Sequence, residues 1–176
     1  MKPINDNVFI ARFEMEKEVG GINVSEKACV KNHIGVCRYA ENDKIVGSTV
    51  HIPHYGVQDI EFDGKEYAMA KEERLFAILE DGEWKPYGAY VRIRKCENDH
   101  VRDESGEIAL YVTKNHIETT NWVEIMDIGD GCKMMGREYI GMFCFCPEND
   151  ERLARIGNTK DFCLHEDLIK FVTTGD

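Results

Sequence analysis

The sequence predicts an all-β protein that contains the same small fold twice. Apolar residues alternate with polar ones around Val8 and Ile10, and again at Val50, which is the pattern of half-buried strands. Asp63 and Gly64 lie between two apolar stretches and predict a two-residue hairpin turn, because both turn positions need a positive φ. Several motifs also recur along the chain, which indicates an internal repeat.

The repeat is visible at a spacing of 83 residues, since residues 31–34 (Lys-Asn-His-Ile) recur as residues 114–117. The Lys-Pro pair at residues 2–3 recurs at residues 85–86 with the same spacing. A weaker echo, 95 residues apart, links the stretch that begins at Lys65 to the one that begins at Lys160. A repeat of this length is typical of two copies of one domain.

We therefore predict two domains, residues 1–82 and residues 83–176. Segment 81–88 contains glycines and a proline, and we interpret it as the short linker between the copies. Domains of this size bury a modest share of their surface and gain stability from association, so we expect an oligomer.

The charge balance argues against a nucleic-acid partner. The chain has 33 acidic and 22 basic residues, a formal net charge of -11, which would repel a phosphate backbone. It has no apolar run near the roughly 18 residues that span a bilayer, and its first residues lack an apolar signal core. We expect a cytoplasmic protein without a membrane partner.

Segment 13–35 interrupts the strand pattern for about twenty residues, far more than a typical loop of about 4 to 6. Within it the apolar residues Ile22 and Val24 follow Gly20 and Gly21. Two interpretations remain open. The pair could form a short edge strand on the core, or the segment could fold onto a groove of a partner.

The seven cysteines show no Cys-x-x-Cys spacing, and we interpret them as small buried hydrophobic residues. A metal site formed by Cys144, Cys146, Cys163 and His165 is the alternative, although strands produce the same period-two spacing. We predict no metal and no cofactor.

A further alternative is that the protein is an enzyme, with His51 and His54 as its main candidate catalytic residues. A strand end that carries two histidines is more often surface than site, and no nucleophile or carboxylate pair accompanies them. We therefore predict no catalytic activity.

The motifs of residues 1–80 have a characteristic order and spacing. They are Pro3, Asp6, Val8, Gly20, Gly21, Ile22, Gly35, Val46, Gly47, residues 55–57 and residues 72–80. In this order they resemble the GroES co-chaperonin family, the ten-kilodalton chaperonins. The second half is similar to the family only through the first.

The resemblance implies two tandem GroES-like small irregular β-barrels that assemble into a homo-oligomer ring. The ring would form a lid on an ATP-bound, GroEL-like chaperonin large subunit and assist protein folding. Flexible apolar loops would make the contact, and several weak loop contacts would act together. The alternative is a structural ring or virion component that keeps the GroES-like fold without chaperonin binding.

The resemblance also assigns the chaperonin-binding residues to the two long loops. In the first copy they are Gly20, Gly21, Ile22, Asn23 and Val24. In the second copy they are Ile108, Ala109 and Leu110, in a loop that lacks the double glycine.

Overall fold

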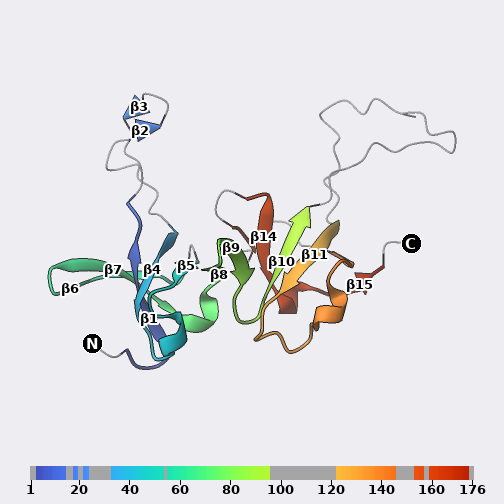
Figure 1. The fold of residues 1–176 in the computed structure, drawn as a ribbon, viewed down its shortest axis with the longest axis horizontal. Helices are drawn as coiled ribbons and strands as arrows, with labels where there is room; N and C mark the ends of the chain where they lie inside the picture. Colours follow the sequence, from blue (N-terminus) through green and yellow to red (C-terminus); the bar gives the residue numbers. More distant parts are fainter. Residues whose placement is uncertain are drawn as a thin grey trace.

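The computed structural model describes residues 3–14, 18–19, 22–23, 33–53, 55–95, 122–145, 153–156 and 159–174. These residues form antiparallel strands and short 3-10 helices, and they include no α-helix. The predicted all-β fold class is confirmed. One sheet has seven strands, a second has six, and the two lie side by side along the long axis of the molecule (Figure 1).

The first sheet has the strand order β6-β7-β1-β4-β5-β8-β9. Its strands are β1 (Asn7–Arg12), β4 (Ile34–Tyr39), β5 (Thr49–His51), β6 (Gln58–Phe62), β7 (Lys65–Lys71), β8 (Ala77–Glu80) and β9 (Glu83–Pro86). Val8, Ile10 and Val50 are fully buried in its core, as their alternation predicts. The predicted hairpin between β6 and β7 is confirmed, with φ of 52° at Asp63 and 68° at Gly64.

The second sheet has the order β13-β14-β10-β11-β12-β15. Its strands are β10 (Tyr90–Lys95), β11 (Trp122–Ile128), β12 (Phe143–Phe145), β13 (Leu153–Arg155), β14 (Asp161–His165) and β15 (Val172–Thr173). This order reproduces the first six strands of the other sheet one for one. Its own core is built around Val91, Ile93, Val123 and Ile125.

The 3-10 helices follow the same repeat. They are η2 (Asp43–Ile45) and η3 (Glu72–Arg74) in the first half, and η5 (Arg137–Tyr139) and η6 (Glu166–Leu168) in the second. Each half also carries a register shift at the same place, between Phe9 and Ile10 in the β1–β4 pair and between Arg92 and Ile93 in the β10–β11 pair. The two halves therefore share one backbone plan, including its irregularity.

The pairing fixes which residues correspond, and the spacing grows along the chain. The spacing is 83 residues from Ile10 to Ile93. Ile10 pairs with Cys37 and Ile93 pairs with Ile125, and the spacing between these two partners is 88 residues. Val8 pairs with Ala70 and Val91 pairs with Leu164, and the spacing between these two partners is 94 residues.

One sequence match was therefore wrong, and another falls largely outside the described residues. Residues 114–117 are not described, but Ile34 corresponds to Trp122, because β4 and β11 are related by a spacing of 88. The echo 95 residues apart is displaced by one residue from the observed spacing of 94.

Segment 81–88, which we interpreted as a linker, contains a strand. Glu83–Pro86 forms β9, which pairs with β8 through a turn with φ of 51° at Asp81 and 83° at Gly82. This Asp-Gly turn has the same signal as the hairpin that the sequence did reveal. The boundary expected between residues 82 and 83 falls inside this hairpin, so the first sheet continues past it.

A buried apolar cluster joins the halves, and we call it the junction. Phe76, Ala77 and Trp84 of the first half meet Tyr90, Ala154, Ile156 and Cys163 of the second. The rings of Phe76 and Tyr90 pack edge to face, with centroids 4.9 Å apart. Edge-to-face packing suits the charge distribution of aromatic rings and adds to the free energy of burial.

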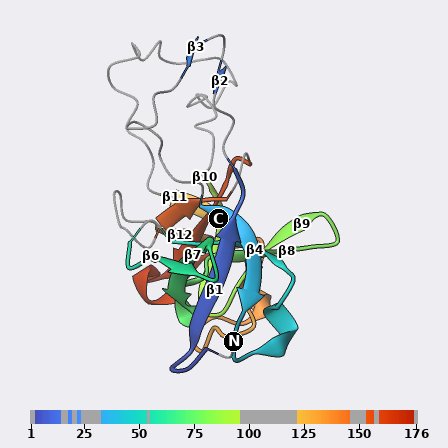
Figure 2. The ribbon, with the colours of Figure 1, turned by 90° about the vertical axis from the view of Figure 1, so that its left-hand side faces the viewer.

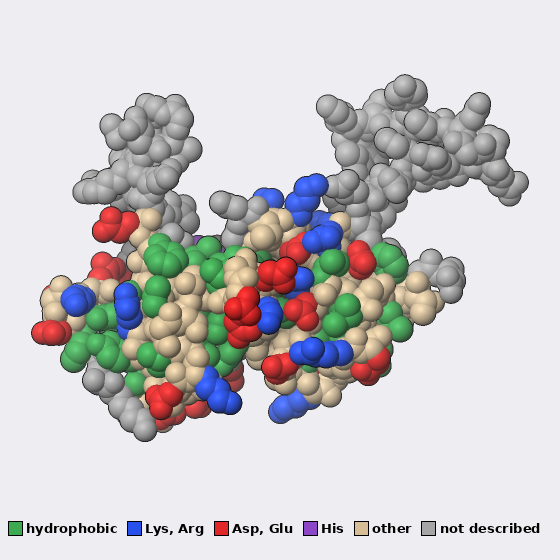
Figure 3. Space-filling model, viewed as in Figure 1, with side chains coloured by type: hydrophobic (Ala, Val, Ile, Leu, Met, Phe, Trp, Pro, Cys, Tyr) green, Lys and Arg blue, Asp and Glu red, His purple; other side chains and the backbone are tan. Residues whose placement is uncertain are grey.

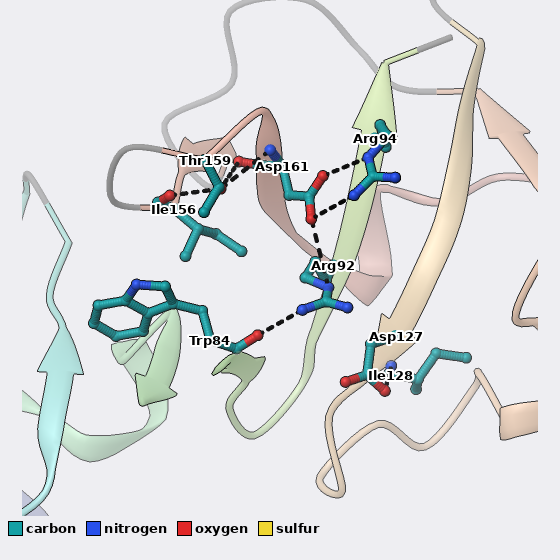
Figure 4. Close-up of polar contacts among 8 residues, drawn as sticks. All are labelled: Trp84, Arg92, Arg94, Asp127, Ile128, Ile156, Thr159 and Asp161. Atoms are coloured by element: carbon teal, nitrogen blue, oxygen red, sulfur yellow. Dashed lines mark hydrogen bonds and ion pairs between the residues drawn. The ribbon is translucent and has the colours of Figure 1, made fainter. Parts of the chain in front are cut away.

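A polar contact runs beside the junction (Figure 4). The Arg92 guanidinium donates a hydrogen bond of 2.8 Å to the backbone carbonyl of Trp84. Arg92 also lies 3.8 Å from Asp161, whose carboxylate accepts two hydrogen bonds from Arg94 at 2.7 and 3.2 Å. The second half thus reaches the first through both apolar and charged groups.

His51 contradicts the expectation of a surface histidine, because only 4% of it is exposed. Its ring lies 5.7 Å from that of Phe76 and 6.1 Å from that of Trp84. These two rings, which come from the β8 and β9 region of the same half, lie against His51, and the local pattern could not reveal this. His54 lies outside the described residues.

Three cysteines are buried as predicted, namely Cys37, Cys144 and Cys163. Cys144 packs in the core of the second half, whereas Cys163 packs in the junction, so the two do not share one apolar cluster. Cys29, Cys96 and Cys146 lie outside the described residues. The described residues contain no helix long and apolar enough to cross a membrane.

Candidate functional site

The base of the first long loop is formed by the ends of β1 and β4. Arg12 pairs with Gly35, and the backbone N–H of Phe13 donates to the carbonyl of Ile34 at 3.0 Å. A Cβ atom on Gly35 would lie 2.4 Å from the backbone oxygen of Ala11, closer than any side chain tolerates. Glycine at position 35 therefore lets the two strands that carry the loop approach each other.

The described part of this loop is a small hairpin. β2 (Glu18–Val19) pairs with β3 (Ile22–Asn23), and Val19 is opposite Ile22. These strands form a sheet of their own and lie apart from the seven-stranded sheet in Figures 1 and 2. Ile22 thus belongs to a strand, but not to an edge of the main sheet.

This hairpin was not among the predicted elements, although the sequence carries a signal for it. Two glycines between Val19 and Ile22 are a typical two-residue hairpin connection. Among the predicted binding residues, Ile22 and Asn23 lie in β3. Outside the described residues lie Gly20, Gly21, Val24, Ile108, Ala109 and Leu110.

The second long connection starts from the equivalent place in the other half. Lys95 at the end of β10 pairs with Val123 of β11, as Arg12 pairs with Gly35. The ammonium group of Lys95 lies 5.4 Å from the centroid of the Phe162 ring, within reach of a cation–π interaction.

The two loop bases face the same side of the molecule. In Figures 1 and 2 the ends of β1 and β4 point the same way as the end of β10 and the start of β11. Both connections therefore leave the protein on one side. Two segments that start from one side can reach one partner surface at the same time.

A cleft of about 760 Å³ lies between the halves, away from these bases. Acidic side chains are prominent around the middle of the face drawn in Figure 3. Inside the cleft Glu72 accepts hydrogen bonds from the hydroxyl of Tyr87 at 2.6 Å and from the amide of Asn42 at 2.9 Å. Burial and the hydrogen bond to Glu72 raise the pKa of Tyr87, so its hydroxyl stays protonated near neutral pH.

Comparisons with known proteins point to one family. Proteins named co-chaperonin GroES from Nitratidesulfovibrio vulgaris and Thermus thermophilus are 31% and 34% identical to this chain over 93 residues. The aligned part covers 46% of this chain and 98% and 92% of those proteins. A co-chaperonin GroES from Lawsonia intracellularis is 26% identical over 92 residues and is covered to 91%. No family model matches the chain.

Proposed function

The chain belongs to the co-chaperonin GroES family, and we propose that it acts as a ring-shaped lid on an ATP-bound chaperonin and so assists protein folding. In this proposal, the first loop binds the chaperonin large subunit through Gly20, Gly21, Ile22, Asn23 and Val24. The second loop binds it through Ile108, Ala109 and Leu110.

The observation that carries the proposal is the common direction of the two loop bases. β1 and β4 in the first half, and β10 and β11 in the second, open toward one side of the molecule. Two loops on one rigid body raise the effective concentration of the second contact once the first has formed. A modest affinity per loop therefore suffices for a tight but reversible lid.

The rigid body itself is explained by the junction. Phe76 and Ile156 are each 1% exposed there, and Ala77 and Cys163 are fully buried. Because apolar burial on this scale opposes relative movement of the halves, the two loop bases keep a fixed separation.

In this function the chain breaks and forms no covalent bond. ATP hydrolysis belongs to the chaperonin, and the chain contributes binding energy and shape. We place the protein in the cytoplasm, where a chaperonin and its unfolded clients are available, and we propose that it assembles as a homo-oligomer.

The test is nucleotide-dependent binding to a purified bacterial chaperonin, measured by co-sedimentation. We expect the wild-type chain to bind with ATP and not without nucleotide. Ile22→Asp and Leu110→Asp should each weaken binding at least tenfold, and the double variant should abolish it, because a buried carboxylate is costly. Limited proteolysis should cut residues 16–32 in the free chain and be slowed in the complex.

Met134→Asp is the matched control, because Met134 is 59% exposed and lies outside both loops. It should bind like the wild type. Wild-type binding that does not depend on nucleotide, or full binding by the double loop variant, would refute the proposed docking.

A further inference from the structure

The two long connections leave the molecule from equivalent strand ends, but different side chains hold those ends. In the first half Arg12, the last residue of β1, forms an ion pair with Asp59 of β6. Of these side chains, 17% of Arg12 and 35% of Asp59 is exposed. The Nε atom of Arg12 is buried, so the guanidinium is partly withdrawn from water and depends on a carboxylate partner more than a solvated one would.

The strand register explains how Arg12 reaches Asp59 across a third strand. Ile10 of β1 pairs with Ala68 of β7, and Ala68 pairs with Asp59 of β6. Paired residues of antiparallel strands lie on one side of a sheet, and so do residues two apart on one strand. Arg12 and Asp59 therefore share the side of Ala68, whose small side chain lets the guanidinium pass over it.

The ion pair lies where β1 extends beyond its neighbour β7. The pairing of β1 with β7 runs from Asn7 to Ile10, whereas the pairing with β4 continues to Arg12 and Gly35. On the β7 side, the carboxylate of Asp59 therefore holds a strand end that the backbone ladder does not reach. We call the Arg12–Asp59 ion pair the loop clamp.

The second half has no such ion pair at the matching positions among its described residues. Lys95, Phe162 and Arg155 occupy there the positions of Arg12, Ala68 and Asp59. Lys95 and Arg155 carry the same charge, so they do not attract each other. Arg155 instead donates a hydrogen bond of 2.8 Å to the backbone carbonyl of Thr159.

The base of the second connection is held in other ways. The pairing of β10 with β14 runs one residue further than that of β1 with β7, to Arg94 and Asp161. The ammonium group of Lys95 lies over the Phe162 ring of the neighbouring strand. The loop clamp is thus a property of the first half, and it ties β1 to a strand beyond its neighbour.

We propose that the loop clamp is a positioning pair for the first loop, which fixes the end of β1 and so lowers the ordering cost of chaperonin binding by that loop. The inference rests on the proposed chaperonin lid and names residues that prepare one of its two loops. A loop with fixed ends loses less conformational entropy on docking than one whose base frays. Arg12 and Asp59 act through the loop and contact no chaperonin themselves.

Hydrogen exchange in the free chain tests the clamp without a chaperonin. The readout is the backbone N–H of Phe13, which donates to the Ile34 carbonyl at the loop base. Asp59→Asn and Arg12→Gln should each speed its exchange about threefold, because opening of the base then breaks no ion pair. The amide of Val123 at the second base should keep its rate.

A rescue and a double variant show that the pair itself is responsible. Asp59→Glu keeps the carboxylate and should restore the wild-type exchange rate of Phe13. Arg12→Gln combined with Asp59→Asn should exchange no faster than either single variant, because both remove one interaction.

Chaperonin binding then tests what the clamp does. In co-sedimentation with ATP, Asp59→Asn should weaken binding about threefold, and Asp59→Glu should bind like the wild type. The loss should persist in Leu110→Asp and disappear in Ile22→Asp, because the clamp acts on the first loop. A general loss of structure would weaken binding in both backgrounds.

Glu80→Gln is the matched control, because it also removes one carboxylate from an ion pair. Glu80 lies 3.0 Å from Lys85 in the β8–β9 hairpin, which projects away from both loop bases (Figure 2). This variant should leave the exchange of Phe13 and the binding of the chaperonin unchanged.

Unchanged Phe13 exchange in Asp59→Asn, no rescue by Asp59→Glu, or an equal loss of binding in the two loop backgrounds would overturn the inference. Faster Phe13 exchange in Asp59→Asn, with a wild-type chain that ignores the chaperonin, would refute the proposed function and support the anchoring of the loop. Nucleotide-dependent binding that Asp59→Asn leaves unchanged would refute the role of the clamp alone.

Discussion

The first and second halves place different chemistry on one backbone. Phe9 and Tyr67 lie outside the core cluster of the first half, although they are only 8% and 6% exposed, and Arg92 and Asp161 occupy the matching positions of the second. The inward-facing positions remain apolar in both, as with Ile10 and Ile93. Core packing thus maintains the strand order, while the outer face follows what it contacts.

The contacts of the two faces explain their difference. The charged face of the second half lies beside the first half, where Arg92 reaches the Trp84 carbonyl. In the first half the rings of Phe9 and Tyr67 pack instead on Tyr39, with centroids 6.4 and 5.8 Å away. The comparison teaches that a repeat can keep its fold while each copy acquires its own chemistry outside the core.

The largest expected effect concerns the junction. Phe76→Ala should cost about 3–5 kcal/mol of unfolding free energy, because it removes a buried ring in contact with Tyr90. Urea unfolding followed by tryptophan fluorescence measures this and should change from one transition to two as the halves uncouple. Lys170→Ala at the matching position of the second half is the control and should change stability little. An equal loss of unfolding free energy in Phe76→Ala and Lys170→Ala would contradict the different roles of these matching positions.

The next effect compares two glutamates at matching positions, Glu72 and Glu166. Glu166 is 6% exposed and accepts backbone N–H groups of Lys133 and Met134 at 2.8–3.0 Å. Glu166→Ala should cost about 1–3 kcal/mol because two backbone N–H groups lose the charged, buried acceptor of their hydrogen bonds. Glu72→Ala should cost less, since its partners Asn42 and Tyr87 line a cleft that water can enter. Thermal unfolding of both variants gives the ranking, and a larger loss for Glu72→Ala would contradict it.

We expect a smaller loss of unfolding free energy, equal in the two halves, at positions where both halves have the same residue in the same turn. Gly47 and Gly141 end equivalent turns with φ of 89° and 85°, and a Cβ atom at either would meet nothing within 4 Å. Alanine at either position should therefore cost about 1–2 kcal/mol through backbone strain alone. Denaturant titration of the two single variants measures this. If the two variants lose clearly different amounts of unfolding free energy, the two turns are not equivalent.

The smallest effect concerns thiol reactivity and leaves stability unchanged. Burial is the main cause that raises the pKa of Cys37 to about 11, so at pH 8 only about 0.1% of this thiol is ionised. Burial also raises the pKa of Cys163 in the junction. Mass spectrometry after iodoacetamide treatment should find both unmodified in the native chain. Phe76→Ala should expose Cys163 and not Cys37, and rapid labelling of Cys163 in the wild type would contradict a closed junction.

The fold class was predictable because the signals are local. Alternation around Val8 reports one apolar side of a strand, and Asp63-Gly64 reports a turn that few other residues allow. The first loop was also recognisable from its length. The β9 hairpin could have been predicted from its Asp-Gly turn, but its glycines and proline suggested a linker.

The sequence by itself determined the all-β class, the presence of a repeat and the place of the first loop. Neighbouring residues encode the class and the loop, and motifs that recur along the chain encode the repeat. Only the tertiary structure decided the register between the copies, the burial of His51 and the contact between Phe76 and Tyr90. The physical reason is that periodicity shows which side of a strand is apolar, whereas what covers that side depends on residues far away in the chain.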